Sequence, residues 1–313
     1  MAAVLAVLQL GACGGAQASG CTRSGGRPHP EIGGQLLYTC YARPAVSGGL
    51  YLLDVATGSV RPLTSDRSWN WGGAWSPDGS QIALESTREG RSDLYVMDVS
   101  DGRVRRLSNG AGFNESPRWS PDGSWISFIS SRSGVRGPYG AAGFHRDIYL
   151  MRPDGTDLRR LTSLSGFDGD ATWSPDGSRI AFASDRGGAF DLFTMTSDGR
   201  DQHQLTHHDS SRGYGAFPSW SPDGSELVFN ATNPPGDSAA ASIYKMPASG
   251  GEATRVTRGY DFHPDWSRNG SWIAFLGARQ GHTQLFAVRP DGSDLTQLTF
   301  EPGDKDIPRW RPG

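Results

Sequence analysis

Short apolar segments separated by polar turns occupy the chain from residue 35 to its C-terminus. Arg179 to Ala183 alternates apolar and small residues, and Asp191 to Met195 does so again after a turn that contains two glycines. Such alternation is typical of half-buried β-strands, and no stretch sustains the i, i+3, i+4, i+7 spacing of an amphipathic helix. The pattern therefore predicts an all-β protein without long helices.

A repeated hexapeptide sets the length of the structural unit. Trp-Ser-Pro-Asp-Gly-Ser begins at Trp75, Trp119, Trp173 and Trp220, the variant Trp-Ser-Arg-Asn-Gly-Ser begins at Trp266, and a truncated copy begins at Trp310. Successive tryptophans are 44 to 54 residues apart. A period of about 40 to 50 residues indicates one four-stranded propeller blade per repeat.

Each repeat contains four predicted strands. In the repeat of Trp173, the first strand ends at that tryptophan, and Arg179 to Ala183, Asp191 to Met195 and His203 to Thr206 follow. The Pro-Asp-Gly after the tryptophan suits a tight turn, because proline presets φ, aspartate accepts local N–H groups and glycine adopts positive φ. We expect the recurring tryptophans to pack between blades rather than to form an aromatic ligand cage.

The two ends of the chain predict one shared blade. Residues 35 to 64 contain three strands without a tryptophan strand before them, whereas Asp306 to Trp310 is a first strand without the other three. Joining these pieces closes the ring and hides the sheet edges that otherwise invite aggregation. The predicted fold class is therefore an all-β, six-bladed β-propeller of four-stranded antiparallel blades, whose first blade is closed by the C-terminal strand.

The repeat unit resembles that of the TolB family of β-propellers. The shared pattern is W-S-P-D-G-S-x-I-A-F-x-S, then D-[IL]-[YF]-x-M, then D-G-x-x-x-x-L-T, over roughly residues 35 to 313. The resemblance implies an envelope protein that binds a partner. TolB-family proteins also carry an α/β domain before the propeller, and we expect this chain to lack it. The expected division is a signal or lipoprotein segment and linker over residues 1–34 and a propeller over 35–313.

The first residues predict export to the periplasm or the outer cell surface. Ala2 to Leu10 is an apolar run too short to span a bilayer, and Leu10-Gly11-Ala12-Cys13 resembles a lipobox, which would make Cys13 the lipidated N-terminus. Cleavage before Ser19 and a disordered tail are the two other interpretations. Cys21 and Cys40 would then form a disulfide or remain as free thiols.

Polar residues predict a binding site at the mouth of the central channel, where the first strand of each blade begins. The formal net charge is −3, which does not favour nucleic acid as a partner. The expected ligand is a basic or amide-rich segment of an envelope protein, or a glycan, bound by a monomer that contacts the membrane only through lipid. The alternative is that these groups bind only neighbouring strands or channel water. The candidate residues are Asn70, Trp71, Asn114, Glu115, Asp168, Asp170, Tyr214, Asp261, His263 and Asp306.

Catalytic and metal-binding motifs are not evident in the sequence. There is no G-x-S-x-G, H-E-x-x-H or P-loop, so we expect no catalytic residue, cofactor or metal. One alternative is a metal-assisted polysaccharide lyase or hydrolase at the same mouth, for which His145, His207, His208 and His263 are the ligands to check. A structural or sensory ectodomain is the third hypothesis, since a fold alone does not choose a function.

Overall fold

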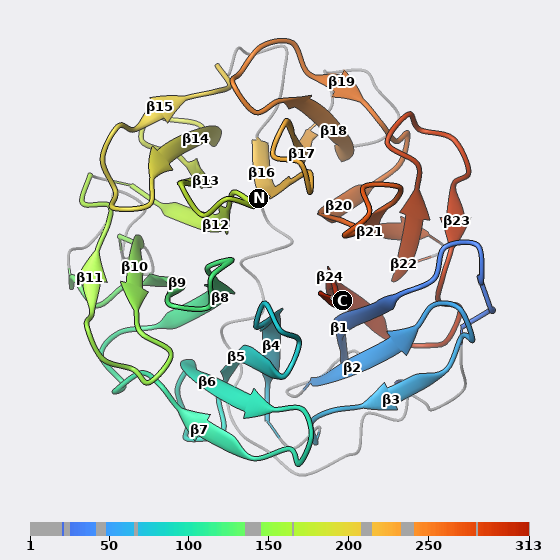
Figure 1. The fold of residues 1–313 in the computed structure, drawn as a ribbon, viewed down its shortest axis with the longest axis horizontal. Coiled ribbons are helices and arrows are strands. Elements are labelled where there is room, and N and C mark those ends of the chain that lie inside the picture. The colour runs from blue at the N-terminus through green and yellow to red at the C-terminus, as the bar shows by residue number, and fades with distance from the viewer. Residues whose placement is uncertain are drawn as a thin grey trace.

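Six four-stranded antiparallel sheets surround a central axis, and each sheet is one propeller blade (Figure 1). The computed structural model describes residues 21, 26–41, 48–65, 68–134, 145–164, 166–207, 215–232, 241–279 and 281–312. Cys13, Tyr214 and His208 lie outside these ranges. Within them every regular element is a strand, which confirms the predicted all-β propeller.

The four strands of each blade run from the channel to the outer edge and are named A to D in that order. Blade 1 contains β24 (Asp304–Trp310), β1 (Gln35–Tyr41), β2 (Gly49–Asp54) and β3 (Val60–Pro62); blade 2 contains β4 (Asn70–Trp75), β5 (Gln81–Ser86), β6 (Asp93–Asp98) and β7 (Val104–Arg106); blade 3 contains β8 (Asn114–Trp119), β9 (Ile126–Ser130), β10 (Asp147–Met151) and β11 (Arg159–Arg160).

The second half of the ring repeats this order. Blade 4 contains β12 (Asp168–Trp173), β13 (Arg179–Ser184), β14 (Asp191–Thr196) and β15 (His203–Gln204); blade 5 contains β16 (Gly215–Trp220), β17 (Glu226–Thr232), β18 (Ala241–Pro247) and β19 (Thr254–Arg255); blade 6 contains β20 (Asp261–Trp266), β21 (Ile273–Arg279), β22 (His282–Val288) and β23 (Thr296–Gln297).

The C-terminal strand closes the ring. β24 pairs antiparallel with β1, so that Leu36 lies opposite Trp310 and Tyr41 opposite Asp304. Figure 1 shows β24 beside β1 at the inner end of blade 1. Residues separated by most of the chain therefore share one sheet, as the sequence predicts, and this sheet closes the ring.

Apolar side chains fill the spaces between adjacent blades. One cluster joins Leu37 and Leu50 of blade 1 to Trp75 and Ile82 of blade 2. Four of the repeated tryptophans, Trp75, Trp173, Trp220 and Trp266, are buried, and each belongs to such a cluster. The tryptophans therefore pack between blades, as expected.

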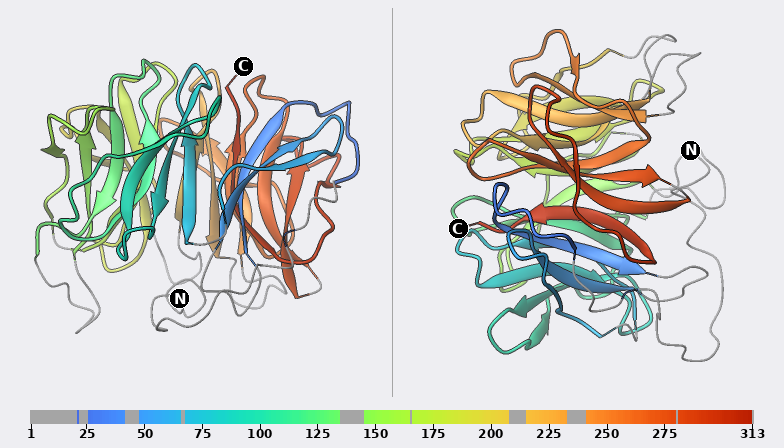
Figure 2. Two further views of the ribbon diagram at one scale, coloured as in Figure 1. Left: turned by 90° about the horizontal axis from the view of Figure 1, so that it is seen from below. Right: turned by 90° about the vertical axis from the view of Figure 1, so that its right-hand side faces the viewer.

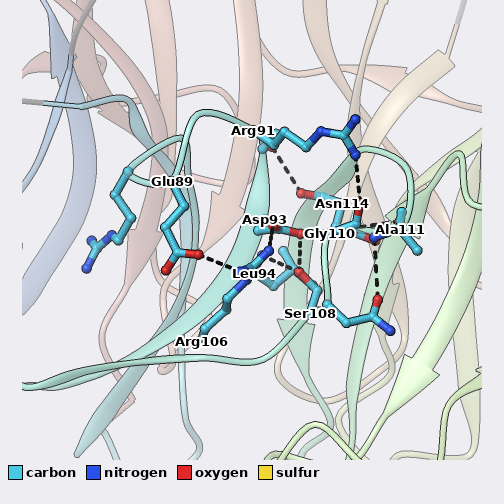
Figure 3. Close-up of polar contacts among 12 residues, drawn as sticks. Glu89, Arg91, Asp93, Leu94, Arg106, Ser108, Gly110, Ala111 and Asn114 are labelled. Atoms are coloured by element: carbon cyan, nitrogen blue, oxygen red, sulfur yellow. Dashed lines mark hydrogen bonds and ion pairs between the residues drawn. The ribbon is translucent and has the colours of Figure 1, made fainter.

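Polar networks near the start of strand C also join adjacent blades. In Figure 3, Asp93 at the start of β6 accepts hydrogen bonds from Ser108 Oγ at 2.5 Å and from Asn114 Nδ2 at 3.0 Å, and it also pairs with Arg106. Because Asn114 belongs to blade 3, the network connects two blades. The buried carboxylate of Asp93 is thereby fully hydrogen-bonded, as a buried charge requires.

The segment before β1 packs on blades 1 and 6. Ile32 is buried in the cluster that these blades share, and the backbone N–H of His29 donates to Val55 O. Cys21 forms a disulfide with Cys40 of β1, with the two Cα atoms 6.1 Å apart. Of the two states left open by the sequence, the bonded state is the one found.

The propeller has two faces, because its strands run between them (Figure 2). The turns after the repeated tryptophans and the C–D turns lie on one, which we call the turn face. The B–C loops and the links from D to the next A lie on the other, which we call the mouth face. No helix in the described ranges is long and apolar enough to cross a membrane.

Candidate functional site

Every strand A bulges at the same position as it lines the channel. The pairing register shifts between Trp71 and Ala74 in blade 2 and at the equivalent place in the other blades. In each case the residue three places before the repeated tryptophan has a left-handed backbone. We call these residues the bulge ring: Gly72 (φ 61°), Ser116 (52°), Asp170 (53°), Phe217 (54°), His263 (51°) and Ile307 (46°).

The bulge ring holds residues that do not favour its backbone conformation. Positive φ is uncommon for residues other than glycine and is a true outlier for bulky or β-branched ones such as Phe217 and Ile307. The strain persists because the surrounding blade fixes the backbone, and bulges commonly re-aim a side chain next to a binding site. The same geometry thus recurs with five different side chains and one glycine.

Asp170 is the acidic member of the bulge ring. Burial raises the pKa of its carboxyl to about 6, although His263, Arg118 and the N–H of Phe217 act in the opposite direction. Its charge therefore appears only as the pH rises through that value. The carboxyl is poised to accept a cationic or amide group from a ligand, because such a partner would replace its lost solvation.

His263 and Asp306 form a second polar group across the junction of blades 6 and 1. Nδ1 of His263 lies 2.7 Å from Oδ1 of Asp306, and both side chains are largely buried. The Phe217 ring meets the His263 ring edge-on, with centroids 3.9 Å apart. This contact fixes the imidazole plane, so the site offers one oriented histidine between an aromatic ring and a carboxylate.

A narrower layer lies below the bulge ring, one residue before each tryptophan. We call Arg118, Ser219, Asp265 and Arg309 the inner ring. Burial raises the pKa of Asp265 to about 7 and lowers that of Arg118. Asp265 accepts the N–H of Trp310 at 2.9 Å and lies 3.7 Å from Nη1 of Arg309. This layer thus sets two arginines against the single carboxyl of Asp265.

The two rings meet at a constriction. Gly72, Ser116 and Asp170 from the bulge ring and Arg118 and Arg309 from the inner ring line a cavity of about 10 Å³. Such a volume holds about one water molecule.

Two carboxyls and a guanidinium lie nearer the mouth face. Glu85 of β5 is close enough to Glu115 of β8 that burial, together with Glu115, raises the pKa of Glu85 to about 8. Its Oε1 accepts Ser92 Oγ at 2.6 Å. Arg146, which precedes β10 in blade 3, pairs with Glu115 of the same blade. At neutral pH Glu85 is therefore mostly protonated, and the group carries little net charge.

Aromatic rings lie at the entrance on the mouth face. Trp71 is half-buried and stacks on Tyr41 with centroids 5.9 Å apart, and Trp69 completes the cluster. In blade 6, which adjoins blade 1, Tyr260 meets Phe262 edge-on at 4.4 Å. Aromatic rings at a channel entrance supply large, rigid contact area at low entropic cost.

Four predicted binding residues are buried inside the blades instead. Asn70, Asn114, Asp168 and Asp261 are at most 2 % exposed. Each accepts a hydrogen bond from an arginine that follows strand B of its own blade. These side chains hold strand A to strand B, whereas Trp71, Glu115, Asp170, His263 and Asp306 lie along the channel or at its entrance.

Sequence reasoning missed the inner ring and Glu85. Arg118, Asp265 and Arg309 occupy the position just before each tryptophan, so counting one place back would have found them. Glu85 lies on strand B, and no repeat signal points to it. Its proximity to Glu115 exists only because blades 2 and 3 pack side by side.

The histidines considered as metal ligands are not gathered together. Nδ1 of His145 accepts the N–H of Gly166 at 2.9 Å, and His263 is bound to Asp306. Among the residues that the structure describes, no group of three or more histidine, cysteine or acidic side chains is placed to hold a metal ion.

Comparison with known proteins supports the repeat assignment. The chain is 48% identical over 50 residues to "Protein TolB homolog" of Chlorobium luteolum, and 39% identical over 62 residues to "Tol-Pal system protein TolB" of Helicobacter hepaticus. These matches cover 16% and 20% of this chain but only 12% and 15% of the relatives' lengths.

The crystal structure of TolB from Acinetobacter baumannii has the same propeller. It superimposes with a TM-score of 0.77 at 25% sequence identity, over 90% of this chain and 67% of that protein. A family model described as the TolB beta propeller domain matches residues 31–142 and 210–313, which is more than half of the sequence. The chain therefore belongs to the TolB β-propeller domain family.

Proposed function

We propose that this protein is a non-catalytic binding scaffold of the cell envelope that holds a segment of a partner protein at its channel mouth. The observation that carries the proposal is the bulge ring, in which six equivalent left-handed positions hold five unlike side chains and one glycine. Repeats that serve packing alone need only one kind of residue at a given position, whereas recognition needs different groups in a fixed arrangement.

The chemistry of the mouth favours a basic or amide-rich segment. Asp170 and Asp306 offer carboxylates, and the aromatic rings of Trp71 and Phe262 offer stacking surfaces for a cationic or amide group. Arg118 and Arg309 lie one layer deeper, in the inner ring that lines the constriction. A polar glycan is the second ligand that such a lining could hold, because sugars also combine hydroxyl hydrogen bonds with stacking on aromatic rings.

An envelope location fits the family and the N-terminus. One relative is named as a protein of the Tol-Pal system. The disulfide between Cys21 and Cys40 is the state expected in an oxidising compartment. We assign the chain to the periplasm or the outer surface, exported by its first residues and held at the membrane, if Cys13 is processed, by lipid alone. In this assignment it acts as a monomer.

Affinity capture from envelope extract tests the proposal. The double variant Asp170→Asn and Asp306→Asn should fold normally and retain at least tenfold less partner than the unchanged protein. The matched control, Asp198→Asn and Asp291→Asn, removes two exposed carboxylates from the turn face and should capture as well as the unchanged protein. Metal content is measured on the same samples.

Two results would contradict the proposal. Equal capture by both double variants would show that the mouth does not hold the partner. A stoichiometric metal ion, together with cleavage of an acidic polysaccharide that the mouth variant abolishes, would establish the lyase or hydrolase alternative.

A further inference from the structure

Neighbouring blades are clamped at their outer edges by the C–D turns. In blades 3, 4 and 6 the glycine of this turn packs on strand D of the preceding blade so closely that a methyl group added to it would clash. Such a group would lie 2.8 Å from Leu107 O at Gly155, 2.8 Å from Leu161 O at Gly199 and 2.9 Å from Val256 O at Gly292. At Gly250 it would lie 3.7 Å from Leu205 Cδ2.

The junction of blades 1 and 2 lacks this clamp. The C–D turn of blade 2 has a different form. The N–H of Gly102 donates to Asp98 O four residues before it, whereas the N–H of Gly155 donates to Arg152 O three residues before it. No atom of the described residues lies within 4 Å of a methyl group placed on Gly102. Leu63, the equivalent of Leu107 in strand D of blade 1, is half-buried and packs against the apolar cluster that blades 1 and 2 share. The C–D turn of blade 2 therefore leaves strand D of blade 1 without the close glycine contact found at Gly155, Gly199 and Gly292.

A second clamp is also missing at this junction. Near the start of strand C, one equivalent position holds a polar residue in five blades: Asp93, Asp147, Asp191, Ser242 and Gln284. These side chains bind the strand D or inter-blade segment beside them, as Asp93 does to Asn114. In blade 1 the position is Gly49, which has no side chain to offer. Asn70 of blade 2 binds the carbonyl oxygens of Gly48, Ser65 and Ser68 instead.

An open groove results between blades 1 and 2. Its volume is about 400 Å³, within the range of small-ligand and peptide sites. Leu63, Met97 and Val104 form its apolar part, and Thr64, Ser68 and Arg88 form its polar part toward the mouth face. Arg88 is the one charged residue among the described residues that line it.

The adjacent junction shows what such a groove can hold. Between blades 6 and 1, the chain's own segment at Gly26 lies between the C–D turn and strand D. A methyl group on Gly58 would lie 2.2 Å from Gly26 O, and one on Gly26 would lie 2.3 Å from Leu298 O. Three residues later, the N–H of His29 pairs with Val55 O at 2.9 Å. An extended peptide with a small residue therefore fills this space one junction away.

The charge of the groove selects the chemistry of the peptide. Nε of Arg88 donates to Ser86 Oγ at 3.1 Å and Nη2 to Asn70 Oδ1 at 3.1 Å, while the guanidinium lies over the Tyr95 ring. These contacts fix its plane and leave Nη1 for another acceptor. A carboxylate is the preferred partner of a fixed guanidinium.

We infer that the groove between blades 1 and 2 binds an extended acidic segment of a partner protein, which places a glycine, alanine or serine against Gly102 and a carboxylate against Arg88. This site is on the side of the propeller and is separate from the channel mouth. The segment would complete the one junction that lacks both clamps, as residues near Gly26 complete the junction of blades 6 and 1.

Selection from a random seven-residue peptide library on the immobilised full chain tests the inference. Bound peptides should be enriched in an aspartate or glutamate beside a small residue. Val104→Trp fills the groove and should reduce their binding at least tenfold, as should Arg88→Gln. The matched control is Arg132→Gln in blade 3, which loses the same type of hydrogen bonds to Ser130 and Asn114 without touching the groove, and it should bind the peptides normally.

The variants also separate groove binding from misfolding. Thermal unfolding should give similar midpoints for Arg88→Gln and Arg132→Gln, so a binding loss confined to the first reports the groove. Recovery of the same peptides by Val104→Trp and the unchanged protein would overturn the inference. So would groove-dependent peptides that lack acidic residues, or peptides that bind only after residues 1–20 are removed, since the chain's own N-terminus would then be the occupant.

Discussion

The two ends of each strand A follow different rules, although they belong to the same repeat. At the turn-face end, the tryptophan and the turn after it recur with nearly the same letters, and Ser76, Ser120, Ser174 and Ser221 all donate to the aspartate two residues later. At the mouth-face end, the bulge recurs but its residue differs in every blade. One end therefore repeats chemistry together with geometry, and the other repeats geometry alone.

This difference separates what holds the ring together from what the ring presents. Each junction between blades must bury a similar apolar surface, so a tryptophan at the same position serves in each repeat. A partner meets the six blades at once and from one side, so it can be recognised only by unlike groups in fixed places. Changes at the turn-face end should therefore alter stability, and changes at the mouth end should alter binding.

The largest expected effect comes from removing a packing tryptophan. Trp173→Ala should lower the free energy of unfolding by about 3–5 kcal/mol, because the ring is buried and its Nε1 donates to Ser127 Oγ at 3.0 Å. Trp71→Ala at the mouth should cost roughly 1 kcal/mol, since it loses mainly a half-buried stack on Tyr41. Denaturant unfolding of both variants measures the contrast. Equal losses of unfolding free energy in the two variants would contradict the distinction between the two ends of strand A.

A smaller effect on stability is expected from replacing Asp265, which lies between the two ends of its strand. Its pKa is raised from 3.8 to about 7 in the folded protein, so the protonated form is favoured on folding. The resulting stabilisation is fully present below pH 4 or so and is lost as the pH rises through about 7. Asp265→Asn should be more stable than the unchanged protein at pH 8, by at least about 1 kcal/mol, and should lose that advantage at pH 4.

Unfolding midpoints across this pH range provide the measurement. Asp122→Asn is a suitable control, because hydrogen bonds from Ser120 and Ser124 lower the pKa of that exposed turn carboxyl. Its contribution therefore has the opposite sign, being present above pH 4 and lost on acidification. Parallel pH profiles for the two variants would contradict the assignment of a buried, protonated Asp265.

The smallest expected effect is a gain in stability from a substitution in a turn at the turn-face end. In blade 6 the turn has Asn269 where four others have aspartate, and Asn269 accepts Ser267 Oγ at 2.8 Å and the N–H of Ser271 at 3.0 Å. Asn269→Asp restores a second acceptor for the Ser271 hydroxyl, as Asp223 provides for Ser225. It should raise the free energy of unfolding by up to about 1 kcal/mol. A loss of stability would contradict the prediction, because it would show that this turn does not accommodate aspartate as the equivalent turns do.

Much of the fold could be predicted because it depends on local, repeated signals. The Trp-Ser-Pro-Asp-Gly-Ser turns mark strand ends, and alternation marks strands B and C, so the strands at Arg179–Ser184 and Asp191–Thr196 appear where expected. Ring closure followed from counting, since β24 supplies the strand that blade 1 lacks. The site was predicted less completely, because counting back from the tryptophan identifies positions in strand A but not the direction of each side chain.

Asn70, Asn114, Asp168 and Asp261 illustrate that limit. They fall one place from Trp71, Glu115 and their equivalents, and successive residues of a strand point to opposite sides. A bulge then inserts one extra residue per strand and changes which side faces the channel. The sequence shows no sign of that bulge, because its left-handed position holds serine, aspartate, phenylalanine, histidine and isoleucine as well as glycine.

The sequence alone determined the strand pattern, the number of blades and the blade shared by both termini, because each follows from periodic signals between near neighbours. Only the tertiary structure decided which polar groups face the channel, that Glu85 meets Glu115, that Cys21 bonds to Cys40 and that blades 1 and 2 leave a groove between them. These features depend on contacts between residues of different blades or distant segments. Such contacts are set by how neighbouring sheets pack, and no single repeat contains that information.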